Sequence, residues 1–423
     1  MAAFLLSDVS NALHNILLPY VRDNFPSQTI LLDQMKRNSG VTYMNNNFYA
    51  PMRSTRHGGV TNIANDGNST ISGTAGLLQA QVGVKILTGA FDISTLAVDA
   101  TKSSKSSVIS ALTFQAKALA TDFSRSANRQ LYGDASGIVA QVLTSSGSVG
   151  AGTLAVKPID ASADDGRALD RYGTVNGDIS PVKYLAPGMV IAVGSPGTAL
   201  GTITSVVSGS TTGTIVVTGA PAIAAEDSIY LIDGSGGGAG TMEVLGIKAA
   251  LSSSTGTSTY AGVARSTLGW TPQFGSEAES LTLTRMEQYY LAAREYSQTG
   301  DKYAIFVNKT LYRKYGDILT SMRRTVDTAE LLGGWKGLEF AAGAGDVGVF
   351  LDYDVPDGEV IILNMDSWTI CQVSDMNWME DPNGTGALLR LANKLQYQAE
   401  LYWFFNALCL APAANAHCTQ KTA

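Results

Sequence analysis

The chain has 423 residues and a formal net charge of −7, and 45% of its residues are hydrophobic while only 15% are charged. This length predicts two or three domains, or one domain with a large insertion, and the low charge content predicts that much of the surface contacts other molecules. The absence of a dense Lys and Arg run excludes a typical reader of nucleic-acid sequence, which needs basic patches to neutralise phosphates.

The cysteines and the first residues of the chain indicate whether the protein is expected to be secreted or inserted in a membrane. Cys371, Cys409 and Cys418 form no CxxC pair and are odd in number, so neither a disulfide framework nor a zinc site is predicted. The first ten residues lack a basic region followed by a long apolar stretch, and the most apolar run, 401–412, is too short and interrupted to cross a bilayer. We therefore expect neither secretion nor membrane insertion.

Residues 1–46 are predicted to form an N-terminal arm. After the capping candidate Ser7, apolar residues recur at helical spacing, which predicts a short amphipathic helix with Val9, Leu13, Ile16, Leu17, Tyr20 and Val21 on one face. An apolar face with no local core needs a partner surface. Leu13, Leu17 and Tyr20 are therefore candidate residues of a subunit interface.

Residues 47–92 are predicted to form a long extended hairpin loop. The segment is polar and Gly-rich, and the alternation of side chains from Gln81 to Ile86 is typical of a strand. Such a composition fits poorly in a core. Arg53 and Arg56, two cations in a weakly charged chain, are predicted to reach acidic groups on a neighbouring subunit.

Residues 93–134 contain the longest predicted element, a helix from about Ser104 to Tyr132. With Ser103 or Ser104 as its cap and Gly133 as its stop, this helix would be roughly 40 Å long at 1.5 Å per residue. Its apolar stripe consists of Val108, Leu112, Ala116, Leu119, Phe123, Ala127 and Leu131.

Residues 135–265 differ in composition from the rest of the chain. They are rich in Gly, Ser, Thr, Val and Ala, and strand-like runs such as PGMVIAVG and GTIVVTG alternate with turn residues. This pattern predicts an inserted small β-barrel or sandwich. We expect it to fold as a separate unit, because its strands lie between elements of the main fold.

Residues 266–380 return to a mixture of helices and strands. Thr284 and Glu287 have the spacing of a capping box before a helix that Gly300 ends, and a second helix is predicted around 311–319. The runs GVFLDYDV and EVIILNM are a predicted strand pair. Residues 381–423 include a long alternating segment, 388–409, that predicts a strand.

The order of these elements resembles the major capsid proteins of tailed bacteriophages, which have the Hong Kong 97-like fold. Three stretches are similar to that family at corresponding positions: KSSVISALTFQAKALATDFSRSANRQLYG, DKYAIFVNKTLYRKYGDIL and GVFLDYDVPDGEVIILN. The resemblance includes no catalytic motif and depends on order and spacing. The insertion departs from the family pattern, and so does the absence of a long charged coil before the arm.

The resemblance implies an α+β fold with named parts: N-terminal arm 1–46, extended loop 47–92, spine helix of a peripheral domain 93–134, inserted domain 135–265, axial domain 266–380 and a strand returning to the peripheral domain 381–423. It implies a structural protein that self-assembles through pentamers and hexamers into an icosahedral shell around double-stranded DNA, without sequence-specific binding. Scaffolding and portal proteins are the implied partners. We expect no catalytic residue, cofactor, metal or membrane contact, and a location in the virion after assembly in the host cytoplasm.

Motifs that suggest other chemistry have plainer interpretations. Gly343–Gly348 fits GxGxxG, but a strand follows it where a nucleotide site needs a helix, so a tight hairpin turn is predicted. The glycines between 234 and 240 predict a flexible loop. Asp352, Asp354 and Asp357 resemble part of a calcium loop, yet a leucine stands where its glutamate is required, so a solvated turn is predicted.

Histidine and aromatic residues give no catalytic pattern either. His14, His57 and His417 are far apart in the sequence, so they predict neither a triad nor a metal cluster and are interpreted as surface or interface residues. Aromatic residues on the long C-terminal strand predict a core or a subunit interface rather than a ligand groove: Tyr397, Tyr402, Trp403, Phe404 and Phe405.

Two other functions are compatible with parts of this pattern. A cargo-encapsulating nanocompartment shell of the same fold would need a groove for a short cargo tail. A secreted β-rich surface protein or adhesin would need a signal peptide, and the long helix disfavours it.

Overall fold

The structure is a computed structural model of the chain. It describes residues 30–60, 62, 65, 67, 72–95, 105–142, 151–157, 184–194, 200–207, 213–219, 227–231, 243–252, 258–277, 279–298, 301–321, 328–330, 336–342, 345–356, 358–380, 389–390, 394–419 and 421–422. The helix expected near the N-terminus, with Leu13, Leu17 and Tyr20, lies outside the described residues, and so do Ser103 and Ser104.

A six-stranded sheet is organised around one long strand, β24 (Gln396–Cys409). Strand β5 (Lys85–Ser94) pairs with it antiparallel over ten residues along one edge. Along the other edge lie, in turn, three shorter strands: β23 (Leu389–Arg390), β22 (Asn377–Trp378) and β21 (Trp368–Gln372). A further short strand, β1 (Lys36–Arg37), pairs with β21 and follows a helical turn, α2 (Ile30–Gln34).

The inner face of this sheet packs against the long helix α4 (Lys105–Tyr132), which ends where the apolar stripe predicted. Alternate residues of β24 are buried on this face, namely Ala399, Leu401, Trp403 and Phe405, in one apolar cluster with Ala116, Ala120, Phe123, Ala127 and Leu131 of the helix. Gly89 of β5 permits the close approach, because a Cβ there would lie 2.9 Å from the Leu119 side chain. The predicted helix is confirmed. Of the predicted strand 388–409, residues 396–409 form β24, whereas 389–390 form the separate strand β23 that pairs with it.

A seven-stranded sheet forms the second layer and has the order β14-β25-β20-β16-β19-β18-β17. Its strands are β14 (Gln273–Gly275), β16 (Tyr303–Val307), β17 (Thr328–Glu330), β18 (Lys336–Ala342), β19 (Gly345–Leu351), β20 (Val360–Asn364) and β25 (Ala416–Cys418). One face packs against α6 (Leu283–Arg294) and α7 (Lys309–Ser321), and the other contributes to the cluster around α4. Two two-residue pairs lie beside these layers: β12 (Thr259–Tyr260) with β13 (Val263–Ala264), and β15 (Glu279–Ser280) with β26 (Lys421–Thr422).

The arrangement of the second sheet corrects three expectations. The runs predicted as a strand pair become β19 and β20, which do not pair with each other because β16 lies between them. The N-cap of α6 is Thr282 and not Thr284: its backbone is extended, and its hydroxyl accepts a hydrogen bond from the Arg285 amide. The third concerns the division of the chain, because β21 and β22 belong to the first sheet while β25 belongs to the second. The predicted boundary at 380/381 therefore does not separate the two sheets.

The chain passes directly between the two sheets from β20 to β21 and from β24 to β25, and Asn415 lies where these two connections meet. This fully buried side chain accepts hydrogen bonds at Oδ1 from the Asn364 amide at 2.8 Å and the Trp368 indole at 3.1 Å. Its Nδ2 donates to Ser367 Oγ at 3.0 Å and to the Ala411 carbonyl at 2.8 Å. One amide thus joins both connections in a region without access to water.

The inserted segment contains a closed β-barrel of order β10-β7-β6-β11-β8-β9. Its strands are β6 (Ile138–Val142), β7 (Ala151–Lys157), β8 (Val190–Val193), β9 (Leu200–Val207), β10 (Gly213–Thr218) and β11 (Ser228–Leu231). The barrel has its own apolar cluster, separate from the one around α4, which includes Val142, Val156, Ile191, Ile215 and Ile229. The glycine run at 234–240 lies outside the described residues.

The barrel ends earlier than the predicted boundary at 265. Residues 247–251 form the helix α5 (Ile247–Leu251), and Ile247, Leu251, Tyr260 and Val263 belong to the apolar cluster around α4. Composition could not reveal this, because the segment remains rich in small residues while it packs into the main core.

A fragment spanning residues 137–232 is expected to fold alone, because the described barrel strands close on one another around their own core. We expect a strand-rich circular dichroism spectrum and a cooperative thermal transition. A random-coil spectrum would show that the barrel depends on the rest of the chain.

Candidate subunit interface

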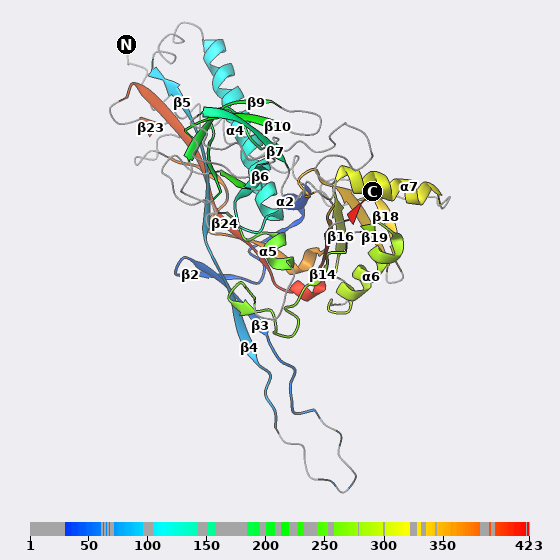
Figure 1. The fold of residues 1–423 in the computed structure, drawn as a ribbon. Helices are drawn as coiled ribbons and strands as arrows, with labels where there is room; N and C mark the ends of the chain where they lie inside the picture. Colours follow the sequence, from blue (N-terminus) through cyan, green and yellow to red (C-terminus); the bar gives the residue numbers. More distant parts are fainter. Residues whose placement is uncertain are drawn as a thin grey trace.

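A hairpin of β3 (Asn47–Arg53) and β4 (Leu77–Gly83) projects from the body (Figure 1). Its base is anchored because Phe48, Ala50, Ala80 and Val82 are buried in the main apolar cluster. Beyond the base, both strands are exposed or half-buried. The hairpin is shorter than predicted: residues 85–94 form β5 in the six-stranded sheet, since Leu87, Phe91 and Ile93 pack toward its core.

A third strand, β2 (Thr42–Met44), completes a small sheet at the base of the hairpin. Asn45 and Asn46 join it to β3 with φ of 50° and 61°, as a two-residue hairpin turn with right-handed strand twist requires. Asparagine tolerates this left-handed conformation better than most residues. The turn therefore fixes the pairing register of β2 with β3 at the base of the hairpin.

The two distal arms, residues 54–60 and 72–76, approach each other closely at glycines. A Cβ on Gly59 would lie 2.9 Å from the Gly73 amide nitrogen, and one on Gly76 would lie 2.7 Å from Thr55 Oγ1. The Ser54 amide donates to the Gly76 carbonyl at 2.9 Å. Glycine at these positions lets the arms run side by side without a core between them.

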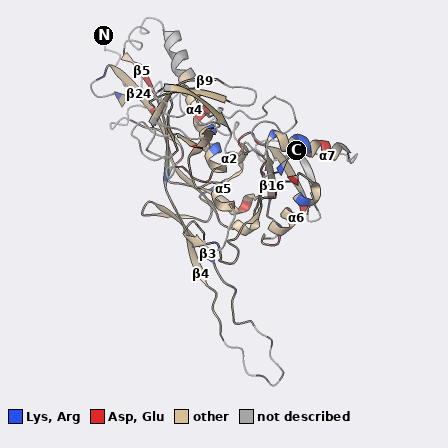
Figure 2. Ribbon diagram, in the orientation of Figure 1, with Lys and Arg blue, Asp and Glu red and all other residues tan. Residues whose placement is uncertain are grey.

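Charged and apolar side chains are exposed together on the hairpin. Among its described residues, 47–60 and 72–83, the charged ones are Arg53 and Arg56, and both are exposed; Figure 2 shows the prevalence of uncharged residues there. The Arg53 Nε donates locally to the Thr55 carbonyl at 2.9 Å. Val60 and Leu77 are 85% and 75% exposed. The hairpin thus offers two cations and apolar side chains that the subunit core does not use.

The outer face of the six-stranded sheet holds a complementary surface, which we call the outer groove. It is a pocket of about 550 Å³ lined by Ile86, Thr88, Asn377, Trp378, Met379, Glu380, Glu400, Tyr402 and Phe404. Ile86 stands opposite Phe404, and Thr88 opposite Tyr402, on the face away from α4. Ile86 and Met379 are 59% and 43% exposed. The groove therefore combines apolar surface with two carboxylates, Glu380 and Glu400.

The aromatic residues of β24 divide between two roles. Trp403 and Phe405 are buried in the core and stack with ring centroids 3.7 Å apart, whereas Tyr402 and Phe404 face the outer groove with centroids 5.1 Å apart. The sequence prediction of core or interface is confirmed for the core pair. It missed Glu380 and Glu400, although Glu400 stands between two inward positions of an alternating strand, and that spacing was the available signal.

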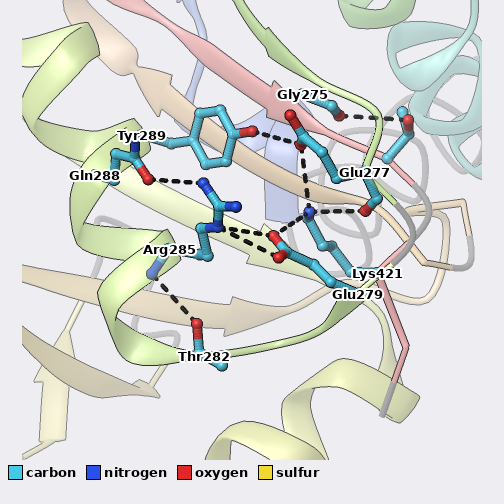
Figure 3. A network of polar contacts seen from close by, with 9 residues as sticks. Gly275, Glu277, Glu279, Thr282, Arg285, Gln288, Tyr289 and Lys421 are labelled. Atoms are coloured by element: carbon cyan, nitrogen blue, oxygen red, sulfur yellow. Dashed lines mark hydrogen bonds and ion pairs between the residues drawn. The ribbon is translucent and has the colours of Figure 1, made fainter.

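A polar network fixes the C-terminal strand (Figure 3). The Lys421 ammonium is 2% exposed and donates to Glu279 Oε1 at 2.9 Å and to the Glu277 carbonyl at 3.0 Å. The hydrogen bond from Tyr289 lowers the pKa of Glu277, and the hydrogen bond from Lys421 lowers the pKa of Glu279. Arg285 also pairs with Glu279. Each of these charges faces an opposite one, so the network has a structural role and holds β26 against β15 and α6.

Two residues that the sequence predicted to be solvated or at the surface are buried. Asp352 is 5% exposed and accepts a hydrogen bond from the Tyr132 hydroxyl at 2.9 Å, so it is no solvated turn residue. His417 is 1% exposed, with Nε2 2.9 Å from Glu359 Oε2, so it is no surface residue. Burial would raise the pKa of Glu359, but His417 and Lys248 outweigh it and lower that pKa.

The remaining motifs have structural places. Ala342 pairs with Gly345 between the antiparallel strands β18 and β19, and residues 343 and 344, the start of the GxGxxG run, lie outside the described residues. His57 lies exposed on the hairpin, and His14 lies outside the described residues. Burial raises the pKa of all three free thiols, Cys371, Cys409 and Cys418, to about 12, as expected for unreactive core residues.

Within the residues that the structure describes, no group of three or more His, Cys, Asp and Glu side chains could hold a metal ion. None of the helices in the described ranges is long and apolar enough to cross a membrane.

No family model and no curated protein matches the sequence. Among solved structures, the capsid asymmetric unit of Cyanophage A-1(L) aligns with 93% of this chain and 92% of its own, at a TM-score of 0.51 and 12% identity. The chain has the fold of a phage capsid protein. The capsid of a native GTA particle (TM-score 0.44, 10% identity, 94% and 91% covered) and a virus-like particle from Pyrococcus furiosus (0.39, 8%, 97% and 99%) align less well. This capsid fold confirms the resemblance seen in the sequence.

Proposed function

We propose that the protein is the major capsid protein of a tailed double-stranded DNA bacteriophage, with the Hong Kong 97-like layout. In this layout α4 is the spine helix of a peripheral domain with the six-stranded sheet, and the seven-stranded sheet is the axial domain. The predicted N-terminal arm 1–46 ends before residue 30, because Ile30, Leu31 and Leu32 are buried in the main apolar cluster and β1 belongs to the six-stranded sheet. The barrel is an insertion directly after the spine helix.

The projecting hairpin is the observation that carries this proposal. The hairpin begins at a base of four buried residues and exposes apolar side chains to solvent. Exposure of these side chains gives an isolated subunit no stability. A contact with another copy would bury them. The capsid fold of the chain supports a lattice of such copies as the source of that contact.

The outer groove is the proposed acceptor for the hairpin of a neighbouring copy. Glu380 and Glu400 match the charges of Arg53 and Arg56, while Ile86 and Met379 match exposed Leu77 and Val60. A surface ion pair contributes only about 0–1 kcal/mol, so no single pair would hold two subunits. A closed shell repeats each contact many times, and the sum decides whether closure occurs.

In this proposal the role is mechanical and not catalytic. The subunits form pentamers and hexamers of an icosahedral shell that encloses double-stranded DNA without reading its sequence, with scaffolding and portal proteins as partners. The shell is assembled in the host cytoplasm and remains in the virion. The chain's net charge of −7 supports an inner wall with little affinity for packed DNA.

Expression of the full chain tests the proposal. We expect the protein to sediment as large particles and to form closed shells in negative-stain micrographs, alone or with a co-expressed scaffolding protein. Persistent monomers under both conditions would contradict it. Shells that enclose a specific protein cargo in the native source, and no DNA, would instead identify a nanocompartment.

A further inference from the structure

Strand β5 is an edge strand of the six-stranded sheet. It pairs with β24 along one side over ten residues, and the next amide, that of Thr95, donates to the Leu395 carbonyl in the same register. In an antiparallel pair every second residue bonds to the partner strand, and the residues between direct their amides and carbonyls to the opposite side. Counted back from Thr95, the residues that direct their main-chain groups away from β24 include Ile86, Thr88, Ala90 and Asp92.

The outward side of β5 is not protected against pairing. The four side chains are exposed, and within the part of the chain that the structure describes their outward amides and carbonyls form no hydrogen bond. A long free edge pairs readily with another strand, so proteins usually protect it with a proline, a bulge or a covering segment. β5 has no proline and no register shift, and its two charges, Lys85 and Asp92, lie near opposite ends. The edge therefore offers main-chain groups to another chain.

The distal arm 72–76 of the hairpin has the properties of a strand that could pair there. Its residues, Ser, Gly, Thr, Ala and Gly, are all small and uncharged. Its backbone bond to the other arm goes from the Ser54 amide to the Gly76 carbonyl, and residues 72–75 form no backbone–backbone bond with any described residue. Small side chains allow an approach to the usual strand spacing of about 4.8 Å. Pairing would satisfy main-chain groups of both β5 and the arm.

We propose that the arm 72–76 of a neighbouring copy adds to β5 as a further strand, which presupposes the shell function proposed above. The arm must come from another copy, because the hairpin of the same chain projects away from the six-stranded sheet (Figure 1). Ile86 and Thr88 of β5 also line the outer groove, so a hairpin paired along β5 lies beside the carboxylates that Arg56 is proposed to reach. In strand addition, main-chain hydrogen bonds supply affinity and side chains supply specificity.

Ala90→Pro tests the pairing at the main chain. Proline removes the outward amide, which β24 does not use, and edge strands tolerate proline where the amide faces away from the sheet. We expect the shell yield in sedimentation to fall at least tenfold, while the melting temperature falls by no more than a few degrees. Ala90→Thr, which keeps the amide, is the matched control and should assemble normally. Normal shells from Ala90→Pro, or equal losses from both variants, would overturn the proposal.

A photo-cross-link identifies the segment that covers β5, even if the proline variant does not fold. With p-benzoylphenylalanine in place of Ala90, illumination of shells should join two chains, and mass spectrometry should locate the link within residues 72–76 of the tryptic peptide 57–85. The same group in place of Leu291, which is exposed on α6, should not label this peptide. Linkage from position 90 to another segment, or no linkage, would overturn strand addition. Failure of the unmodified chain to form shells would instead contradict the proposed function.

Discussion

Deletion of residues 54–76, with a short turn joining β3 to β4, is expected to abolish shells while the subunit melts at nearly the same temperature. The removed arms contribute nothing to the described core, whereas the buried residues at the base of the hairpin remain. Sedimentation separates subunits or rings from shells, and differential scanning fluorimetry gives the melting temperature. Normal shell yield would refute the proposed contact, and a collapsed melting temperature would place the arms in the subunit's own fold.

Charge reversal makes the same test specific to the outer groove. Arg53→Glu with Arg56→Glu should lower shell yield sharply, since four like charges would then meet in each contact. Adding Glu380→Lys and Glu400→Lys to this variant should restore much of the yield. Glu380→Lys with Glu400→Lys alone should lower shell yield as sharply as the two substitutions on the hairpin do. Equal yields with and without the compensating changes would show that the hairpin docks elsewhere.

Asn415→Leu is expected to destabilise the subunit by at least ~2 kcal/mol. Leucine preserves the volume, but it leaves the Asn364 amide and the Trp368 indole without their hydrogen bonds in a fully buried place. Each unsatisfied buried group costs about 1–3 kcal/mol. Urea unfolding of the hairpin-deleted subunit gives the free energy of unfolding without interference from assembly.

Asn377→Leu provides the matched control. The Asn377 side chain is half-buried in β22, and its Oδ1 accepts a hydrogen bond from the adjacent Trp378 amide. We expect a loss below about 1 kcal/mol, as for most partly exposed positions. Similar losses at Asn377 and Asn415 would mean that the hydrogen bonds at the crossing are not important for stability.

Local patterns predicted the elements that a single periodicity specifies. The stripe ending at Leu131 and the alternation on β24 depend on one face being buried, and that face is visible in the sequence. The predicted boundaries of elements were wrong where two neighbouring residues fitted the same end of an element equally well. Thr282 and Thr284 both precede a helical pattern, and the extended backbone and the capping hydrogen bond belong to Thr282 in the structure.

The polar sites could not be predicted because their partners are distant in the sequence. Asp352 is 220 positions from Tyr132 and 224 from Asn128, and no local feature of DYDVPDG indicates burial. The outer groove could not be predicted for the same reason, since its residues on β5 and β22 are distant in the sequence and are brought together only by β24. The charges of Arg53 and Arg56 were visible in the sequence, but the groove that matches them required the sheet.

The position of β24 and β25 late in the chain has a consequence for synthesis. β24 is the strand to which β5, β21, β22 and β23 all attach, and β25 joins β14 to β20. Until residues 396–418 have left the ribosome, neither sheet is complete. A nascent chain therefore has no finished surface to offer to other copies, and prematurely terminated chains have no native subunit to contribute. Translation itself delays association until a whole subunit exists.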